Sequence, residues 1–311
     1  MLNNLKWIIP LIVLVALVGA YFIPVPSVPF SQLYAKANPD TTKSLVAFRE
    51  ANPTKYVYVD GIEWDYIIVG SGQETILFLH GMTGSYDIWW QQIDALKKDY
   101  RIISVTYPAV NSLEEMDKGI STIIDHEKVD KVNLVGTSLG GYFAQYLVAR
   151  HSDHILRAVF ANTFPPNKII AEKNKTIGTL LPYLPEWLVL SVLRESFANS
   201  IYPASGNDEF TLAFLNEISY GRMSKAQVVG RYRAVIEPFV APDVQVLGVP
   251  TMIIESDNDP LVEPALREAL KATYPSAGVY TFHNAGHFSY LNHPAEYTDL
   301  LKKFFQTPIS K

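Results

Sequence analysis

The stretch that decides the fold runs from Lys131 to Arg150 and reads KVNLVGTSLGGYFAQYLVAR. It opens with KVNLV, which has a strand pattern, and closes with YFAQYLVAR, which has a helical pattern. Between them, GTSLG fits the G-x-S-x-G pattern of a strand–serine–helix turn, which holds Ser138 exposed at the start of a helix. A serine that merely caps the helix is the alternative interpretation.

Strand and helix patterns alternate on both sides of this stretch. Strands are predicted at residues 56–59, 63–69, 75–79, 101–105, 132–135, 157–161, 250–255 and 279–282. Helices are predicted at residues 89–96, 113–124, 138–150, 263–272 and 295–305. The pair Asp60-Gly61 predicts a hairpin between the first two strands. This alternation predicts an α/β fold with a mostly parallel, eight-stranded sheet flanked by helices.

The alternation is interrupted between residues 165 and 248, where helix-like runs, prolines and aromatic residues gather. We expect a helical cap over the carboxyl edge of the sheet, where α/β sites lie. An insertion that only adds core is the simpler interpretation. The predicted organisation is an N-terminal segment at 1–30, a core at 31–164 and 249–311, and a cap at 165–248. The apolar run at 180–188 is expected to pack on the core or, alternatively, to form the wall of an acyl pocket.

The N-terminal segment contains an uncharged apolar run, WIIPLIVLVALVGAYFI, at Trp7–Ile23. At ~1.5 Å per residue this run just reaches across a bilayer, and Lys6 before it favours a cytoplasmic N-terminus. It predicts a membrane anchor with the catalytic part outside the cytoplasm. Val18-Gly19-Ala20 resembles a cleavage site, so a secreted protein is the second possibility and a buried core helix the third. The prolines that follow predict an extended stalk.

Composition narrows the possible functions. The chain has 311 residues, 26 Lys and Arg against 31 Asp and Glu, and a net charge of −5. Because it lacks a basic excess, we expect no nucleic-acid partner. It has no cysteine, which excludes disulfides, thiolate catalysis and zinc-finger or iron–sulfur ligation. No metal and no organic cofactor is expected, and the oligomeric state is left open.

A nucleophilic serine needs a base within hydrogen-bonding reach and an acid that orients the base. In this kind of fold the order along the chain is serine, acid, histidine. His287 lies in the loop after the last predicted strand, on the same sheet edge as Ser138. It is preferred over the histidines on or beside helices and strand ends, His126, His151, His154, His283 and His293.

The acid is expected after the strand at 250–255, in Ser256-Asp257-Asn258-Asp259-Pro260. Asp259 is the favoured residue, because Asp257 is better placed to cap the turn backbone. The earlier strand at 157–161 cannot supply the acid, since Asn162 and Thr163 follow it.

An oxyanion needs preorganised donors. The backbone N–H of Leu139, directly after the serine, is one expected donor. The second is the N–H of Met82 in the glycine-containing loop HGMTG at 80–84, which His80 is expected to orient. One of Trp89 and Trp90 is expected to line the pocket, and the other to pack in the core.

Four motifs follow one another in the order found in the α/β-hydrolase superfamily: HGMTG, GTSLGG, ESDNDPLV and NAGHFSYLNHP. The chain resembles that superfamily over residues 56–305. The resemblance implies a triad of Ser138, Asp259 and His287 with backbone donors at Met82 and Leu139. A serine nucleophile argues against the dehalogenase and epoxide hydrolase branches, which need a carboxylate. The stretch at 100–145 also looks like the maspardin branch, whose members need not be enzymes.

The expected function is therefore a carboxylesterase-like serine hydrolase. It would cleave a small ester or related acyl substrate through an acyl-enzyme on Ser138. One alternative is a non-catalytic, maspardin-like binding protein. The other is a C–C bond hydrolase or cofactor-free peroxidase that uses the same triad.

Overall fold

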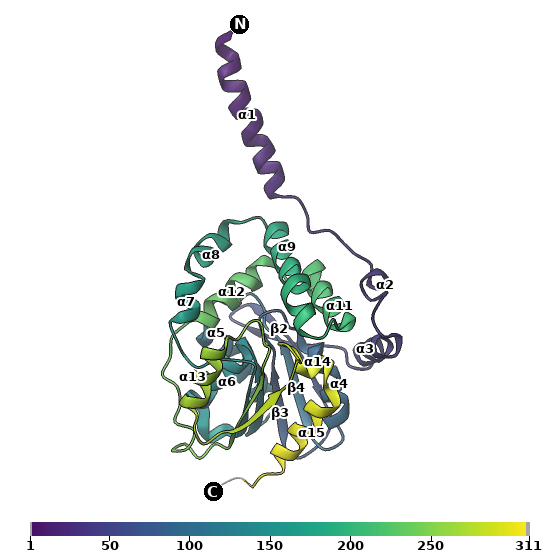
Figure 1. Cartoon of the computed structure of the whole chain (residues 1–311), viewed down its shortest axis with the longest axis vertical. Helices are drawn as coiled ribbons and strands as arrows, with labels where there is room; N and C mark the ends of the chain where they lie inside the picture. Colours follow the sequence, from purple (N-terminus) through teal and green to yellow (C-terminus); the bar gives the residue numbers. More distant parts are fainter. Residues whose placement is uncertain (1, 309–311) are drawn as a thin grey trace.

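One central sheet organises the molecule (Figure 1). A computed structural model describes the backbone of residues 2–308 and the side chains of residues 9–308. The sheet has eight strands in the order β1-β2-β4-β3-β5-β6-β7-β8. The pairs β1–β2 and β2–β4 are antiparallel, and all other neighbours are parallel. The predicted eight-stranded, mostly parallel sheet is confirmed.

The strands lie close to their predicted positions. They are β1 (Lys55–Val59), β2 (Ile62–Val69), β3 (Thr75–Leu79), β4 (Arg101–Thr106), β5 (Val132–Thr137), β6 (Ile155–Ala161), β7 (Thr251–Ser256) and β8 (Gly278–Phe282). The hairpin turn between β1 and β2 has positive φ at both Asp60 and Gly61, as a two-residue turn of this kind requires.

Helices cover both faces of the sheet, so the central strands β3, β5 and β7 are buried at every position. On one face lie α4 (Trp90–Leu96), α14 (Ser289–Asn292) and α15 (Pro294–Phe305); on the other lie α5 (Leu113–His126), α6 (Leu139–His151) and α13 (Pro264–Thr273). β3 shows the alternation, because Ile76 and Phe78 join one core while Leu77 and Leu79 join the other. Two buried faces explain the continuous apolar runs of the parallel strands.

The insertion between β6 and β7 is helical and is called the cap below. It comprises α7 (Ile169–Lys173), α8 (Lys175–Leu180), α9 (Glu186–Ser196), α10 (Tyr202–Ala204), α11 (Glu209–Glu217) and α12 (Lys225–Ile236), with π-helical turns at Phe197–Ile201 and Ile218–Arg222. These helices lie over one edge of the sheet in Figure 1. The fold class with a helical cap is confirmed, while the boundaries at 165 and 248 remain our proposal.

An N-terminal segment before the sheet also packs on the core. It contains α2 (Phe30–Leu33) and α3 (Pro39–Ala51), and the side chain of Asn38 caps α3. Arg49 of α3 donates through Nε to Asp87 at 2.7 Å and pairs with Glu217 of the cap at 2.9 Å. Asp87 is buried and also accepts from Arg222 of the cap at 2.8 Å. This ion-pair cluster joins the N-terminal segment, the core and the cap.

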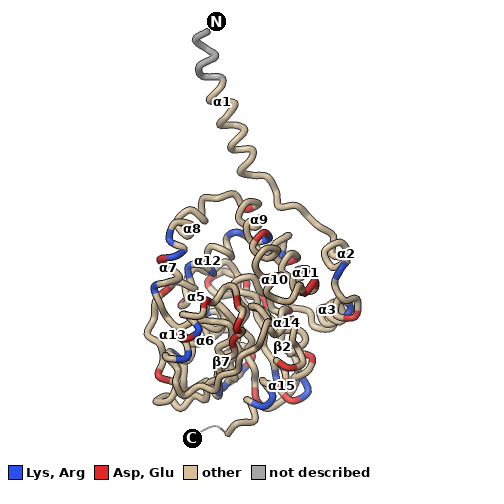
Figure 2. The backbone as a smooth tube through the Cα atoms, viewed as in Figure 1, with Lys and Arg blue, Asp and Glu red and all other residues tan. Residues whose placement is uncertain are grey.

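The first helix, α1 (Leu2–Tyr21), corrects one prediction. Its described side chains, from residue 9 on, carry no charge (Figure 2). The helix ends at Tyr21, before Phe22 and Ile23 of the predicted run. In the described part of the chain, no helix is both long enough and apolar enough to cross a membrane.

This finding overturns three linked predictions. These are the anchor or signal segment at Trp7–Ile23, the contact with a membrane through it, and the placement of the catalytic part outside the cytoplasm. Lys6 and Trp7, which entered that prediction, lie outside the residues whose side chains are described.

Candidate functional site

Ser138 stands on a tight turn between β5 and α6. Its backbone has φ 54° and ψ −122°, which a residue with a side chain rarely adopts. The turn is held from β6, because the Ser138 N–H donates to the Ala161 carbonyl at 2.9 Å and the Thr163 hydroxyl donates to the Ser138 carbonyl at 2.8 Å. Strain of this kind persists only where neighbours enforce it, and it gathers at functional sites.

The turn is possible because α6 approaches β3 closely. A Cβ on Gly140 would lie 2.0 Å from the carbonyl oxygen of Leu79. No side chain fits there, so the G-x-S-x-G pattern follows from the packing of the helix against the strand.

His287 and Asp259 lie together in the loops after β8 and β7. The Nδ1 atom of His287 lies 2.8 and 3.0 Å from the two carboxylate oxygens of Asp259. Both side chains are buried. Since Nδ1 is engaged by the carboxylate, Nε2 is the ring nitrogen left for the cavity that His287 shares with Ser138.

The surroundings of Asp259 stabilise its charged form. Burial alone would raise the pKa of the carboxyl group, but His287, the Asn162 amide and the Leu261 N–H outweigh it and hold the pKa below its usual range. The amide of Asn162 donates to Oδ2 at 2.9 Å, and the Leu261 N–H donates to Oδ1 at 2.8 Å. Sequence reasoning used Asn162 only to exclude an acid after β6. The signal that could have indicated this contact was the position of Asn162 directly after β6, at the carboxyl end of a central strand.

The alternative acid, Asp257, lies elsewhere. Its carboxylate accepts from the Asn284 N–H at 2.9 Å and lies 2.7 Å from Nδ1 of His283. The structure therefore places Asp259, and not Asp257, against His287.

Ser138 and His287 line one cavity of about 170 Å³ together with Met82 and Gly81. Most of the remaining wall is apolar, with Leu193, Phe197 and Ile201 from the cap and Leu261 and Phe288 from the core loops. Three polar residues, Thr83, Thr137 and Ser196, also line it. The run at 180–188 and the two tryptophans do not line it. Trp89 and Trp90 are both buried in the core, so the expectation that one of them lines the pocket is wrong.

The two predicted oxyanion donors adjoin this cavity, since Leu139 directly follows Ser138 in its wall and Met82 belongs to the wall. Leu139 is the first residue of α6, so its N–H has no acceptor within the helix. Met82 lies in the loop after β3 and lines the cavity itself.

His80 fixes the loop that carries Met82. The Tyr107 N–H donates to Nε2 of His80 at 3.2 Å, which makes Nε2 an acceptor and leaves the proton on Nδ1. Nδ1 then donates to the Gly81 carbonyl at 2.6 Å. Burial, aided by the nearby charge of Arg231, holds the pKa of His80 well below its usual range, so the ring is neutral near pH 7.

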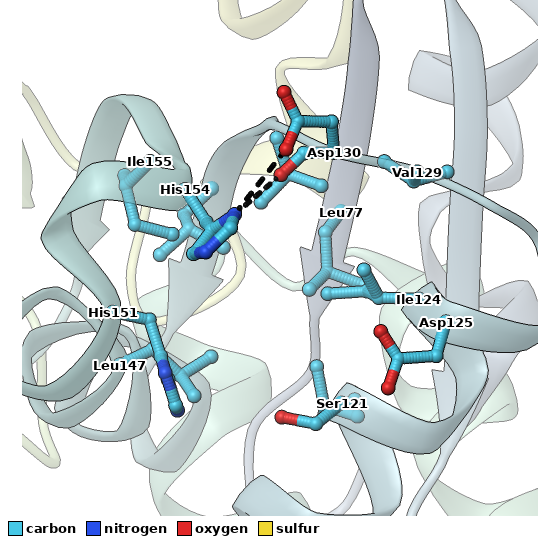
Figure 3. A pocket seen from close by; sticks show the side chains of 13 residues that line it. Leu77, Ser121, Ile124, Asp125, Val129, Asp130, Leu147, His151, His154 and Ile155 are labelled. Atoms are coloured by element: carbon cyan, nitrogen blue, oxygen red, sulfur yellow. Dashed lines mark hydrogen bonds and ion pairs between the residues drawn. The ribbon is translucent and has the colours of Figure 1, made fainter.

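A larger cavity of about 330 Å³ lies at the opposite edge of the sheet, where β5 and β6 begin (Figure 3). Its lining includes Ser121, His151 and His154, and His154 contacts Asp130. It shares no lining residue with the Ser138 cavity. Over the described residues, no group of three or more His, Asp or Glu side chains is arranged to hold a metal ion.

Comparisons with known proteins agree with this architecture. Residues 74–294 match the family model described as the alpha/beta hydrolase fold. Maspardin from Danio rerio is 27% identical over 259 residues, which cover 80% of this chain and 81% of that protein. A hydrolase from Pseudomonas aeruginosa superposes with a TM-score of 0.72 at 18% identity, over 82% of this chain and 99% of its own. An enol-lactonase from Burkholderia xenovorans superposes with a TM-score of 0.70 at 19% identity, over 81% of this chain and 100% of its own. The family match spans more than half of the sequence, and this chain belongs to the α/β-hydrolase fold family.

Proposed function

We propose that this protein is a serine hydrolase that cleaves a carboxylic ester or a related acyl compound. The observation that carries the proposal is the shared cavity: Ser138 and His287 both line it, and His287 is bonded to the buried, charged Asp259. Membership of the α/β-hydrolase fold family supports a hydrolytic function in general, and the solved structures with a similar fold include hydrolases.

Each residue has one role in the proposed reaction. The Oγ atom of Ser138 attacks the acyl carbon while Nε2 of His287 takes its proton, and Asp259 stabilises the resulting imidazolium. The N–H groups of Met82 and Leu139 stabilise the oxyanion. Collapse breaks the bond to the leaving oxygen, which departs with the proton from His287. Water then attacks the acyl-enzyme, His287 takes a proton from it, and the carboxylic acid leaves as the proton returns to Ser138.

The cavity indicates the class of acyl group. Its wall is mostly apolar, and its volume of about 170 Å³ is small. Pockets that hold drug-sized ligands are larger, roughly 300 to 1,000 Å³. We therefore expect a short apolar acyl chain.

The test uses the full-length protein and a series of p-nitrophenyl esters of increasing acyl length. We expect hydrolysis that is highest for short chains and at least ~10³-fold lower in Ser138→Ala. Ser121→Ala is a matched control, because that serine lines the other cavity, and it keeps wild-type activity. Equal activity in wild type and Ser138→Ala would refute the proposal.

A non-catalytic binding protein is the second candidate, because the similarity to maspardin extends over most of the chain. A folded wild-type protein that neither hydrolyses the esters nor reacts at Ser138 with a fluorophosphonate would favour this function. Labelling of Ser138 that Ser138→Ala abolishes would favour the hydrolase.

A further inference from the structure

The cap helix α12 carries a buried arginine that contacts the loop at 80–84, which includes Met82. Arg231 is 1% exposed. Its Nη1 atom donates to the Met82 carbonyl at 2.7 Å and to the Gly84 carbonyl at 3.2 Å, and it lies 3.5 Å from the Met223 sulfur. Its Nη2 atom donates to the Tyr107 carbonyl at 2.8 Å. One side chain of the cap thus bonds to two loops of the core.

The contact matters because of where it falls relative to Met82. The N–H of Met82 belongs to the same peptide unit as the Gly81 carbonyl, which His80 holds through Nδ1. The carbonyl of Met82 belongs to the next peptide unit, which Arg231 holds. Because peptide units are planar, holding the units before and after the Met82 Cα atom fixes the direction in which the Met82 N–H points.

The two anchors are themselves joined through Tyr107. Its N–H donates to His80, and its carbonyl accepts from Arg231. The phenol ring also lies against both side chains, with its centroid 4.0 Å from that of His80 and 5.9 Å from the Arg231 guanidinium carbon. Burial lowers the pKa of Arg231 to about 10, so the guanidinium remains charged near pH 7. A charged donor forms a stronger hydrogen bond to a carbonyl than a neutral one does.

We propose that Arg231 is a positioning residue for the reaction, and that it aims the Met82 N–H at the oxyanion from the cap. The inference rests on the proposed function, since it needs an acyl transfer in which an oxyanion forms. It also makes catalysis depend on the cap, because the residue that orients the donor stands on α12 and not on the core.

The experiment compares kcat and KM of full-length wild type, Arg231→Met and Arg231→Lys with the best p-nitrophenyl ester. Removing an oxyanion donor costs ~10²- to 10³-fold in kcat, and a misdirected donor is expected to cost about 10- to 100-fold. We expect Arg231→Met to lower kcat by that amount with KM changed less than about 3-fold. Arg231→Lys keeps a charged donor without the fork, and it should recover part of the loss.

Arg157→Met is the matched control. Arg157 is also buried, and its guanidinium bonds to Glu74, Asn133 and the Thr307 carbonyl near the start of β6, away from Ser138. If Arg231 has a purely structural role, both methionine variants lose thermal stability, which circular dichroism measures. Both also keep the wild-type kcat per folded molecule, once the active sites are counted by fluorophosphonate titration. That result for Arg231→Met would overturn the inference.

Two other outcomes are decisive. If Arg231→Met does not fold, Arg231→Lys alone tests the inference. A trifluoromethyl ketone forms an oxyanion adduct with the serine, so the variant should bind it more weakly than wild type and have a lower kcat. A wild-type kcat together with an unchanged inhibition constant for the ketone would contradict the inference. If the wild type itself neither turns over esters nor reacts at Ser138, the proposed function fails first.

Discussion

Acid should destabilise this protein from about pH 6.5 downward, because of His80. The folded state keeps His80 neutral, since burial and the charge of Arg231 hold its pKa well below the usual 6.5. The unfolded chain has no such environment, so its His80 takes up a proton as the pH falls through 6.5. The unfolded state then binds more protons than the folded state, and the free energy of unfolding decreases as the pH falls.

The size of the effect follows from that difference. While the folded ring stays neutral, the slope approaches about 1.4 kcal/mol per pH unit below pH 6. Between pH 7 and pH 5.5 the loss from this one residue is about 1.3 kcal/mol. The loss stops growing only when the pH falls through the lowered pKa of the folded state.

Urea unfolding followed by tryptophan fluorescence at pH 7 and pH 5.5 measures this loss in wild type and in His80→Gln. Other groups also titrate, so the relevant quantity is the difference between the two proteins. The variant should lose about 1.3 kcal/mol less than wild type over the same interval. His126→Gln, which replaces an exposed histidine, should lose as much as wild type. An equal loss in wild type and His80→Gln would show that the ring accepts a proton as readily in the folded protein as in the unfolded chain, and the lowered pKa of His80 would be wrong.

Three further predictions concern the site and its supports. Asp259→Asn keeps the shape of the acid but removes its charge beside His287, so ester turnover should fall about 10⁴-fold while circular dichroism stays unchanged. Gly140→Ala drives a methyl group to 2.0 Å from the Leu79 carbonyl, and urea unfolding should show a loss of about 3 kcal/mol; a loss below about 1 kcal/mol would mean that α6 can move away. Asp87→Ala leaves Arg49 and Arg222 without their shared carboxylate, which should cost about 3 kcal/mol at pH 7. The cost should be smaller below pH 4, because Asp87 of the unfolded wild-type chain then takes up a proton while the folded carboxylate, whose pKa is lowered, stays charged; an equal cost at both pH values would contradict the role of its charge.

The sheet could be predicted because its strands carry their own signals. β3, β5 and β7 are buried at every position, so each is built mainly of apolar residues. The turn at Asp60-Gly61 and the elbow at Ser138 need backbone conformations that only a few residue patterns favour. Local sequence therefore determines where these elements begin and end.

Contacts between distant segments left no such signal. Arg49 meets Glu217 across 168 positions, and Arg231 meets Met82 across 149. Of the two interpretations of the run at 180–188, the pocket wall was the wrong one, because an apolar run in the cap does not reveal which of its neighbours turns toward the core. The membrane prediction was wrong because, over the described residues, no helix is both long enough and apolar enough to cross a bilayer.

The position of the cap in the chain has a consequence for synthesis. β6 pairs with β7 through Ala158 and Thr251, so the ribosome must make the whole insertion before β6 gains its second neighbour. Until then β6 is an apolar edge strand, a surface on which another chain can add a strand. Ser138 is made early, but Asp259 and His287 emerge only with β7 and β8. A nascent chain truncated within the cap therefore lacks two residues of the proposed triad and, at the same stage, is most prone to aggregate.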